Sequence, residues 1–157
     1  MFLCQRIGNL HFQISRKSLL FFCAQMIKGN TVICMCPGEV APVAGTPMDF
    51  RTRKVIGQDI GAEFEQIAFA GGFDHNYVLS EAPGEMKVMA RACCKETGIA
   101  MEASTECCGV QFYAGNFIGD QTGKGGAAYC DRCGFCLEAQ FYPDAVNQKN
   151  FPSSLVP

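Results

Sequence analysis

Glycine and proline residues divide the chain beyond about residue 36 into short segments, and this punctuation limits the available folds more than any other feature. The stretch PGEVAPVAGTP at 37–47 can be neither a helix nor a central strand, because its prolines remove backbone donors and its glycines weaken regular structure, and we expect an extended loop there. Residues 86–94 and 99–103 alternate apolar and polar side chains on either side of Lys95-Glu96-Thr97-Gly98. That pattern predicts a β-hairpin with a four-residue connection.

Other segments extend the same pattern. Residues 110–113 are expected to form a further short strand, and the glycine-rich stretch 123–126 a flexible loop. One short helix is expected within 59–68, where apolar residues recur at helical spacing. In the first arm of the hairpin, strict alternation predicts one apolar face formed by Met86, Val88, Ala90 and Ala92. Several short antiparallel strands together predict an all-β fold, a sandwich or a barrel.

Composition narrows the class of protein. The 157 residues are 48% apolar and 18% charged, which is typical of one globular domain and not of a disordered tail. The net charge of -2 and the absence of a Lys/Arg cluster argue against a nucleic-acid partner or an anionic membrane. Because no apolar run approaches the roughly 20 residues that span a bilayer, an integral membrane protein is not expected. Neutral polar substrates fit this balance better.

The first 36 residues differ in character from the rest. Arg6, Arg16 and Lys17 precede a short apolar run at 18–27, as in a weak secretory leader, but the basic residues lie far in and no small-x-small cleavage site follows. We therefore interpret 1–36 as an unmatched leader that is not native to the fold, and 37–157 as the folded part. Eleven cysteines favour a reducing compartment, so we expect a cytoplasmic protein.

The segment GFCLEAQ at 134–140 carries the main candidate for chemistry. On a strand, Phe135, Leu137, Ala139 and Phe141 would point one way, and Cys136, Glu138 and Gln140 the other. Glu138 would then lie on the polar side, where a general base that acts on a sugar could sit. The polar, proline-containing stretch at 141–148 predicts a loop that can close over a ligand.

Four blocks of sequence resemble the carboxy-terminal portion of the aldose 1-epimerase (galactose mutarotase) family. They occur in the family's order, and the resemblance runs from Gly38 to the end of the chain. The blocks are GEVAPVAGTPMDFR at 38–51, GFDHNYVL at 72–79, GVQFYAGNF at 109–117 and GFCLEAQFYPDAVNQKNFPSS at 134–154.

The resemblance implies a large antiparallel β-sandwich that interconverts the α and β anomers of hexoses such as galactose and glucose, without a cofactor or a metal. It implies that Glu138 is the general base, that Asp74 binds sugar hydroxyls and that Gln111 is a binding-site amide. In this chemistry a histidine protonates the ring oxygen, yet the chain holds only His11 and His75, and neither stands at the family's position. The chain is thus expected to be a truncated member, weak or inactive, whose open sheet edge invites self-association.

Two alternatives to an enzyme stay open. A non-catalytic carbohydrate-binding remnant would keep Asp74, Gln111 and Glu138 without chemistry. A metal-binding protein is suggested by the overlapping C-x-x-C spacings of Cys130, Cys133 and Cys136 and by three further cysteine pairs at 34/36, 93/94 and 107/108. Adjacent cysteines on a strand point to opposite faces, however, so reduced cysteines that serve as small buried hydrophobes are the preferred interpretation.

Overall fold

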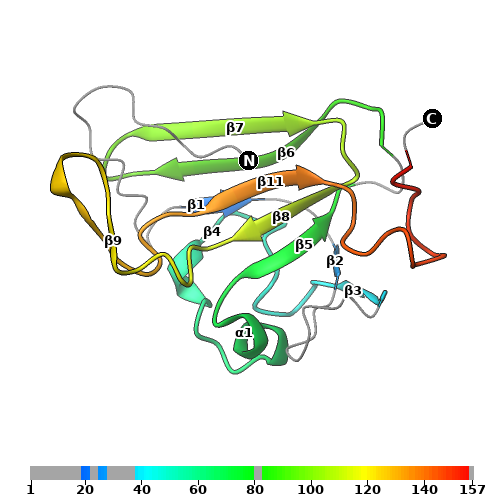
Figure 1. Cartoon of the computed structure of the whole chain (residues 1–157), viewed down its shortest axis with the longest axis horizontal. Coiled ribbons are helices and arrows are strands. Elements are labelled where there is room, and N and C mark those ends of the chain that lie inside the picture. Colours follow the sequence, from blue (N-terminus) through cyan, green and yellow to red (C-terminus); the bar gives the residue numbers. More distant parts are fainter. Residues whose placement is uncertain (1–18, 22–24, 28–37, 80–82, 156–157) are drawn as a thin grey trace.

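The computed structural model describes residues 19–21, 25–27, 38–79 and 83–155, and its main feature is a pair of antiparallel sheets that pack face to face (Figure 1). The five-stranded sheet has the order β11 (Cys136–Gln140), β8 (Gly109–Tyr113), β5 (Asp74–Val78), β2 (Gln25–Ile27) and β3 (Val40–Pro42). The four-stranded sheet has the order β4 (Lys54–Val55), β1 (Leu19–Phe21), β6 (Lys87–Cys94) and β7 (Ile99–Thr105). The all-β, antiparallel sandwich class predicted from the sequence is confirmed.

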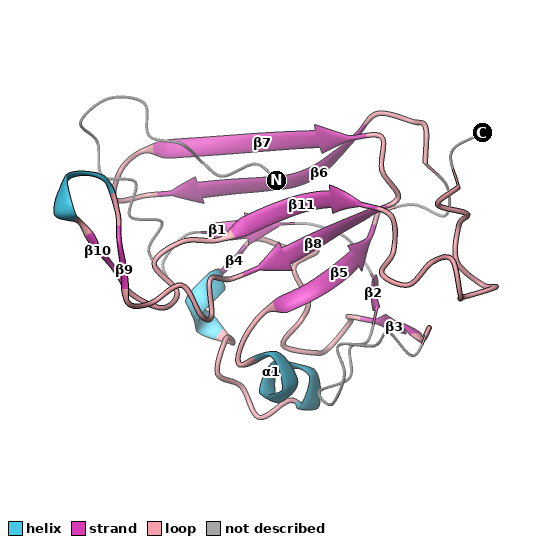
Figure 2. Ribbon diagram, viewed as in Figure 1, coloured by secondary structure: helices cyan, strands magenta, loops and turns pink. Residues whose placement is uncertain are grey.

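Smaller elements connect these strands (Figure 2). They are the helix α1 (Glu65–Ala70), the 3-10 turns η1 (Ile56–Gln58) and η2 (Lys124–Gly126), and a two-stranded ribbon of β9 (Gln121–Thr122) and β10 (Ala128–Tyr129). Residues 59–63 form turns, so the helix predicted within 59–68 begins later, after the extended Phe64. It ends at Gly71, which adopts the left-handed conformation that glycine tolerates and donates its N–H to the Ile67 carbonyl.

Aromatic rings fill the space between the two sheets. Phe112 extends from β8 on the inner face, and its ring centroid lies 5.4 Å from that of Phe50 and 5.6 Å from that of Phe73. Met89, Ala90 and Ala92 of β6 close the core from the other sheet. Offset and edge-on aromatic contacts of this kind add about 0.5–1.5 kcal/mol each beyond the burial of area. The core therefore holds the inner face of β5, β8 and β11 in place, and leaves their outer face to the solvent.

One predicted face is wrong. The register between β6 and β7 shifts between Val88 and Ala90, so that Met89 is an extra residue, a β-bulge. Alternation inverts there: Met86 and Val88 are exposed, whereas Met89 and Ala90 are both buried. The four-residue connection of this hairpin, by contrast, is found as predicted between Cys94 and Ile99.

Two described strands belong to the stretch interpreted as a leader. β1 pairs with β4 and β6, and β2 pairs with β3 and β5, so both lie inside their sheets. The boundary at residue 36 stays a prediction. In the described part of the chain β7 has a neighbour on one side only, and self-association through such an edge also stays a prediction.

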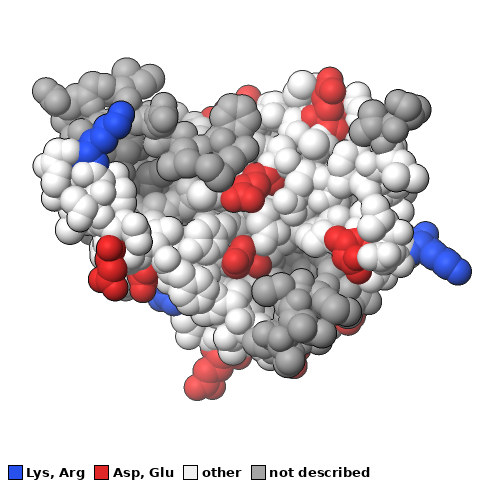
Figure 3. Space-filling model, in the orientation of Figure 1, with Lys and Arg blue, Asp and Glu red and all other residues white. Residues whose placement is uncertain are grey.

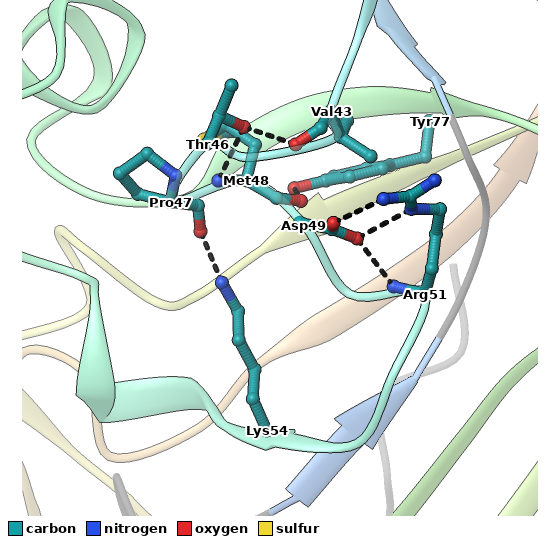
Figure 4. Close-up of polar contacts among 8 residues, drawn as sticks. All are labelled: Val43, Thr46, Pro47, Met48, Asp49, Arg51, Lys54 and Tyr77. Carbon is teal, nitrogen blue, oxygen red and sulfur yellow. Dashed lines mark hydrogen bonds and ion pairs between the residues drawn. The ribbon is translucent and has the colours of Figure 1, made fainter.

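The segment before β4 forms a hydrogen-bonded corner against β5 (Figure 4). The Thr46 hydroxyl donates to the Val43 carbonyl at 2.7 Å and accepts from the Met48 amide at 3.2 Å. The buried Tyr77 hydroxyl donates to the Met48 carbonyl at 3.2 Å, and burial, together with nearby Asp49, raises the pKa of Tyr77. β3 forms a short strand within the stretch 37–47, where the sequence predicted only an extended loop. It lies at the edge of its sheet and contains Pro42, in agreement with the expectation that this stretch is not a central strand.

Ion pairs complete the corner. Arg51 donates two hydrogen bonds to the Asp49 carboxylate, which lowers the pKa of Asp49. The Lys54 ammonium donates to the Pro47 carbonyl and to Asp59 at 2.9 Å, and it lies 4.3 Å from the centre of the Phe50 ring. A lysine that makes these contacts joins the corner to the edge of the core.

Among the residues described, no helix is both long and apolar enough to cross a membrane.

Candidate functional site

The outer face of β5, β8 and β11 carries a row of polar side chains. Because facing residues of antiparallel strands share one side of a sheet, the register decides which of them meet. Glu138 of β11 lies opposite Gln111 of β8, and Gln111 lies opposite Asn76 of β5. One step along the face, Asp74 lies opposite Tyr113. Three segments far apart in the sequence therefore present their amides and carboxylates side by side.

An open pocket of about 520 Å³ lies over this row of side chains. Its lining residues are Asp74, Gln111, Tyr113, Phe117, Glu138, Gln140, Phe141 and Pro143. Figure 3 shows acidic atoms over the region of β11, β8 and β5, with the Lys and Arg side chains near the margins of the view. Among the described residues, the lining includes two carboxylates and no Lys, Arg or His, so it suits a neutral polyol better than an anion.

Hydrogen bonds orient the amides of this pocket. Gln111 donates from Nε2 to Asp74 Oδ1 at 2.7 Å, and Gln140 donates from Nε2 to Asn76 Oδ1 at 3.1 Å. A longer contact of 3.4 Å joins Gln140 Nε2 to Gln111 Oε1. The buried Nδ2 of Asn76 has no partner among the described residues. The row is therefore ordered before any ligand arrives, which reduces the entropic cost of binding one.

Glu138 differs from its neighbours. It is half-buried, and in the described part of the chain its carboxylate forms neither a hydrogen bond nor an ion pair. Burial, together with the negative charges of Glu138 and Asp74, raises the pKa of the Cys136 thiol. A carboxylate without a partner among the described residues keeps its lone pairs available to a ligand.

Comparison with known proteins assigns the family. The sequence model of the aldose 1-epimerase family matches residues 24–157. The chain belongs to the aldose 1-epimerase family. The match begins before Gly38, the residue at which the resemblance seen in the sequence begins, and it includes β2.

The relatives of this epimerase-family chain are longer than it is. It is 44% identical to human galactose mutarotase over 120 residues, which are 76% of this chain and 33% of that protein. It is 34% identical to Escherichia coli K12 aldose 1-epimerase over 110 residues, 70% of this chain and 32% of that protein. The chain therefore spans about a third of the length of the curated relatives it matches.

Solved structures share the fold. A GalM/aldose epimerase homologue from C. elegans superposes with a TM-score of 0.73 at 23% identity, over 88% of this chain and 40% of that one. A galactose 1-epimerase from Lactobacillus acidophilus superposes with a TM-score of 0.62, also at 23% identity, over 82% of this chain and 36% of that one. The sandwich seen here thus corresponds to part of the larger fold of each of these two structures.

The structure brings together the three residues singled out from the sequence of this family member. Asp74, Gln111 and Glu138 line the same pocket, although Asp74 and Gln111 are 37 positions apart. His75 lies on the opposite, inner side of β5, where it is buried; burial lowers its pKa to about 4, and a hydrogen bond with the Gln66 backbone opposes the shift. His11 lies outside the described residues.

Several lining residues of this epimerase-family pocket were not singled out. Gln140 was expected on the polar side of its strand, and Tyr113 follows Gln111 by two residues, so alternation could have identified both. Phe141 was expected on the inner side, but β11 ends at Gln140 and Phe141 lines the pocket instead. Phe117 is 73% exposed on a loop, where no periodic signal exists.

The cysteines do not assemble a metal centre among the described residues. No group of three or more His, Cys, Asp or Glu side chains there could hold a metal ion. The described cysteines are free, and Cys130, Cys133 and Cys136 range from exposed to half-buried. The metal-binding alternative therefore has no support in this part of the chain.

Proposed function

We propose that this chain supplies part of an aldose 1-epimerase site that interconverts the α and β anomers of hexoses such as galactose and glucose, with Glu138 as the general base. One observation carries the proposal: the Glu138 carboxylate, which has no partner among the described residues, lines the same pocket as the hydrogen-bonded pair of Gln111 and Asp74. A base needs a free acceptor near the proton it removes, and a sugar needs oriented amides and carboxylates around its hydroxyls.

The proposed reaction follows from that arrangement. Glu138 removes the proton of the anomeric hydroxyl, an acid protonates the ring oxygen, and the bond between C1 and the ring oxygen breaks. Rotation about the C1–C2 bond and closure from the other face give the second anomer, and the two protons return. Asp74 and Gln111 hold hydroxyls during this sequence, and the exposed ring of Phe117 offers an apolar surface to the C–H groups of the sugar.

The acid is the missing component. The described lining of the pocket contains no histidine, and His75 belongs to the inner face of β5. General acid catalysis typically contributes about 10²–10⁴-fold. We therefore propose that the isolated chain accelerates anomer exchange weakly, and that the rest of the site lies outside the described residues.

The test compares anomer exchange with sugar binding. Polarimetry of freshly dissolved α-D-galactose measures exchange, and saturation-transfer difference NMR measures binding. We expect Glu138→Gln to abolish the acceleration while binding persists. Glu106→Gln is the matched control, because it removes the same charge from an exposed residue outside the pocket. Equal acceleration by Glu138→Gln and the unsubstituted chain would refute the role of Glu138.

A second candidate function is a carbohydrate-binding remnant without chemistry. The ordered row of Asp74, Gln111, Gln140 and Asn76 favours it, because the row exists without the acid that the reaction needs. Saturable galactose binding without any acceleration would favour this candidate over the enzyme. Neither binding nor acceleration would contradict both.

We also propose a cytoplasmic location. The described cysteines are all free although two adjacent pairs, 93/94 and 107/108, are among them. Thiols of this number persist in a reducing compartment.

A further inference from the structure

The turn between β10 and β11 contains a pair of cysteines that the proposed reaction does not use. Cys133 donates its N–H to the Cys130 carbonyl at 3.2 Å, which closes a β-turn. The two Cα atoms of a β-turn's first and fourth residues lie within about 7 Å, and disulfides join Cα atoms about 4.4–6.8 Å apart. Both thiols are free; Cys130 is exposed and Cys133 half-buried. The backbone therefore already holds the two residues at a separation that a disulfide can bridge.

The third cysteine of the motif is placed differently. Cys136 begins β11, and no hydrogen-bonded turn closes the segment from Cys133 to Cys136. The structure therefore gives no backbone contact that holds Cys133 and Cys136 at the separation that a disulfide needs. Glu138 and Asp74 act electrostatically on Cys136, so its thiol belongs to the surroundings of the pocket. The geometry thus selects Cys130 and Cys133 from two overlapping C-x-x-C spacings.

Hydrogen bonds tie this turn to the rim of the pocket. The Arg132 amide donates to the Gly115 carbonyl at 2.7 Å, and the Arg132 guanidinium donates to the Gly71 carbonyl at 2.6 Å. The Gly119 amide donates to Asp131 at 2.7 Å. Phe117, which lines the pocket, lies in the loop between Gly115 and Gly119, both of which these hydrogen bonds anchor. Whatever stiffens the turn therefore also stiffens the loop that presents Phe117.

We propose that Cys130 and Cys133 form a redox-active dithiol, which a low-molecular-weight disulfide oxidises to an intramolecular bridge that locks the turn against the rim of the pocket. The exposed Cys130 loses its proton and attacks one sulfur of the small disulfide, whose S–S bond breaks and releases one thiol. Cys133 then loses its proton and attacks the Cys130 sulfur of the mixed disulfide, which releases the second thiol. Two cysteine thiols are oxidised, and one small disulfide is reduced to two thiols.

The first test identifies the bridge. The reduced chain is equilibrated in buffers of oxidised and reduced glutathione, quenched with acid, alkylated and digested with trypsin. Because trypsin cleaves after Lys124, Arg132 and Lys149, a bridge from Cys130 to Cys133 joins the peptides 125–132 and 133–149. A bridge from Cys133 to Cys136 would instead lie inside the second peptide.

We expect the cross-linked pair of peptides in the unsubstituted chain and in the control Cys136→Ser. We expect its loss in Cys130→Ser and in Cys133→Ser. Three results would overturn the proposal: both thiols stay open to alkylation at every ratio, glutathione remains on Cys130 without transfer to Cys133, or the bridge forms inside 133–149. None of these readouts involves a sugar, so they test the dithiol independently of the epimerase proposal.

The second test addresses the lock. Amide hydrogen exchange of Arg132 and Gly119, the two donors that tie the turn to the rim, is compared by NMR in the reduced and oxidised chains. We expect exchange at both amides to slow severalfold after oxidation, with the exposed hairpin turn at 95–98 as an internal control that does not change. Equal or faster exchange in the oxidised chain would show that the bridge does not lock the rim.

Discussion

Asn116 offers the clearest measurement of how the loop beside the pocket is held. Its side chain is 4% exposed, and its Nδ2 donates to the Ala70 carbonyl at 3.0 Å and to the Phe73 carbonyl at 3.1 Å. One amide thus joins the end of α1 and the start of β5 to the loop that carries Phe117. Replacement of Asn116 by alanine removes both hydrogen bonds and leaves the buried Phe73 carbonyl and the partly buried Ala70 carbonyl each with one acceptor site unused.

The magnitude follows from these contacts. A hydrogen bond contributes about 1 kcal/mol net, and more when its loss leaves a buried group unsatisfied. Two such bonds predict that Asn116→Ala lowers the free energy of unfolding by about 2–3 kcal/mol. Oδ1 of Asn116 has no partner among the described residues, so its removal adds no further loss. With a slope of about 2 kcal/mol per molar urea, the midpoint should fall by about 1–1.5 M.

Equilibrium urea denaturation followed by circular dichroism measures this shift. Asn147→Ala is the control: Asn147 is exposed, and surface substitutions of this kind usually change stability by less than about 0.5 kcal/mol. Asn116→Asp should lower the urea midpoint further than Asn116→Ala, because a carboxylate would face the two carbonyl oxygens. Equal midpoints for Asn116→Ala and Asn147→Ala would refute the argument that this amide anchors the loop.

Two further predictions concern pH and backbone conformation. Burial of His75 lowers its pKa from 6.5 to about 4, so its contribution to stability is present above pH 6.5 and is lost as the pH falls from 6.5 through about 4. His75→Gln should therefore flatten the pH dependence of the urea midpoint between pH 6.5 and about 4. An unchanged slope in that range would contradict the prediction. Gly72 has φ +146, and a Cβ there would lie 2.2 Å from Asn116 Oδ1. Gly72→Ala should therefore lower the thermal midpoint far more than the control Gly45→Ala, because at Gly45 φ is +72 and nothing lies within 4 Å of the added Cβ. Similar losses in the two variants would contradict the steric argument.

Local sequence patterns predicted much of the framework. The hairpin of β6 and β7, the strand β8 and the strand β11 follow from alternation and turn residues, which act over a few neighbouring positions. The same alternation predicted the polar side of β11 for Glu138. The pattern failed where one residue was inserted, at the bulge of Met89, and where a strand ended, at Phe141.

The resemblance to a family, and not the pattern, singled out Asp74 and Gln111. No local signal relates them, because the strand between Gly109 and Tyr113 could pair with several others. Their 2.7 Å hydrogen bond depends on β5 and β8 being neighbours in the sheet. The family resemblance therefore indicated Asp74 and Gln111 as candidates, and the pairing of β5 with β8 explains why the two side chains meet.

Sequence alone determined that this chain forms short antiparallel strands, with a glutamate on the solvent side of the last of them, because side-chain direction along a strand is a property of each residue and its immediate neighbours. Tertiary structure decided that β5, β8 and β11 lie side by side, that His75 is enclosed in the core and that Phe117 stands at the rim of the pocket. Strand order arises from long-range burial of apolar surface, which many segments of similar composition could satisfy. Only the folded structure shows which of these segments become neighbours in a sheet.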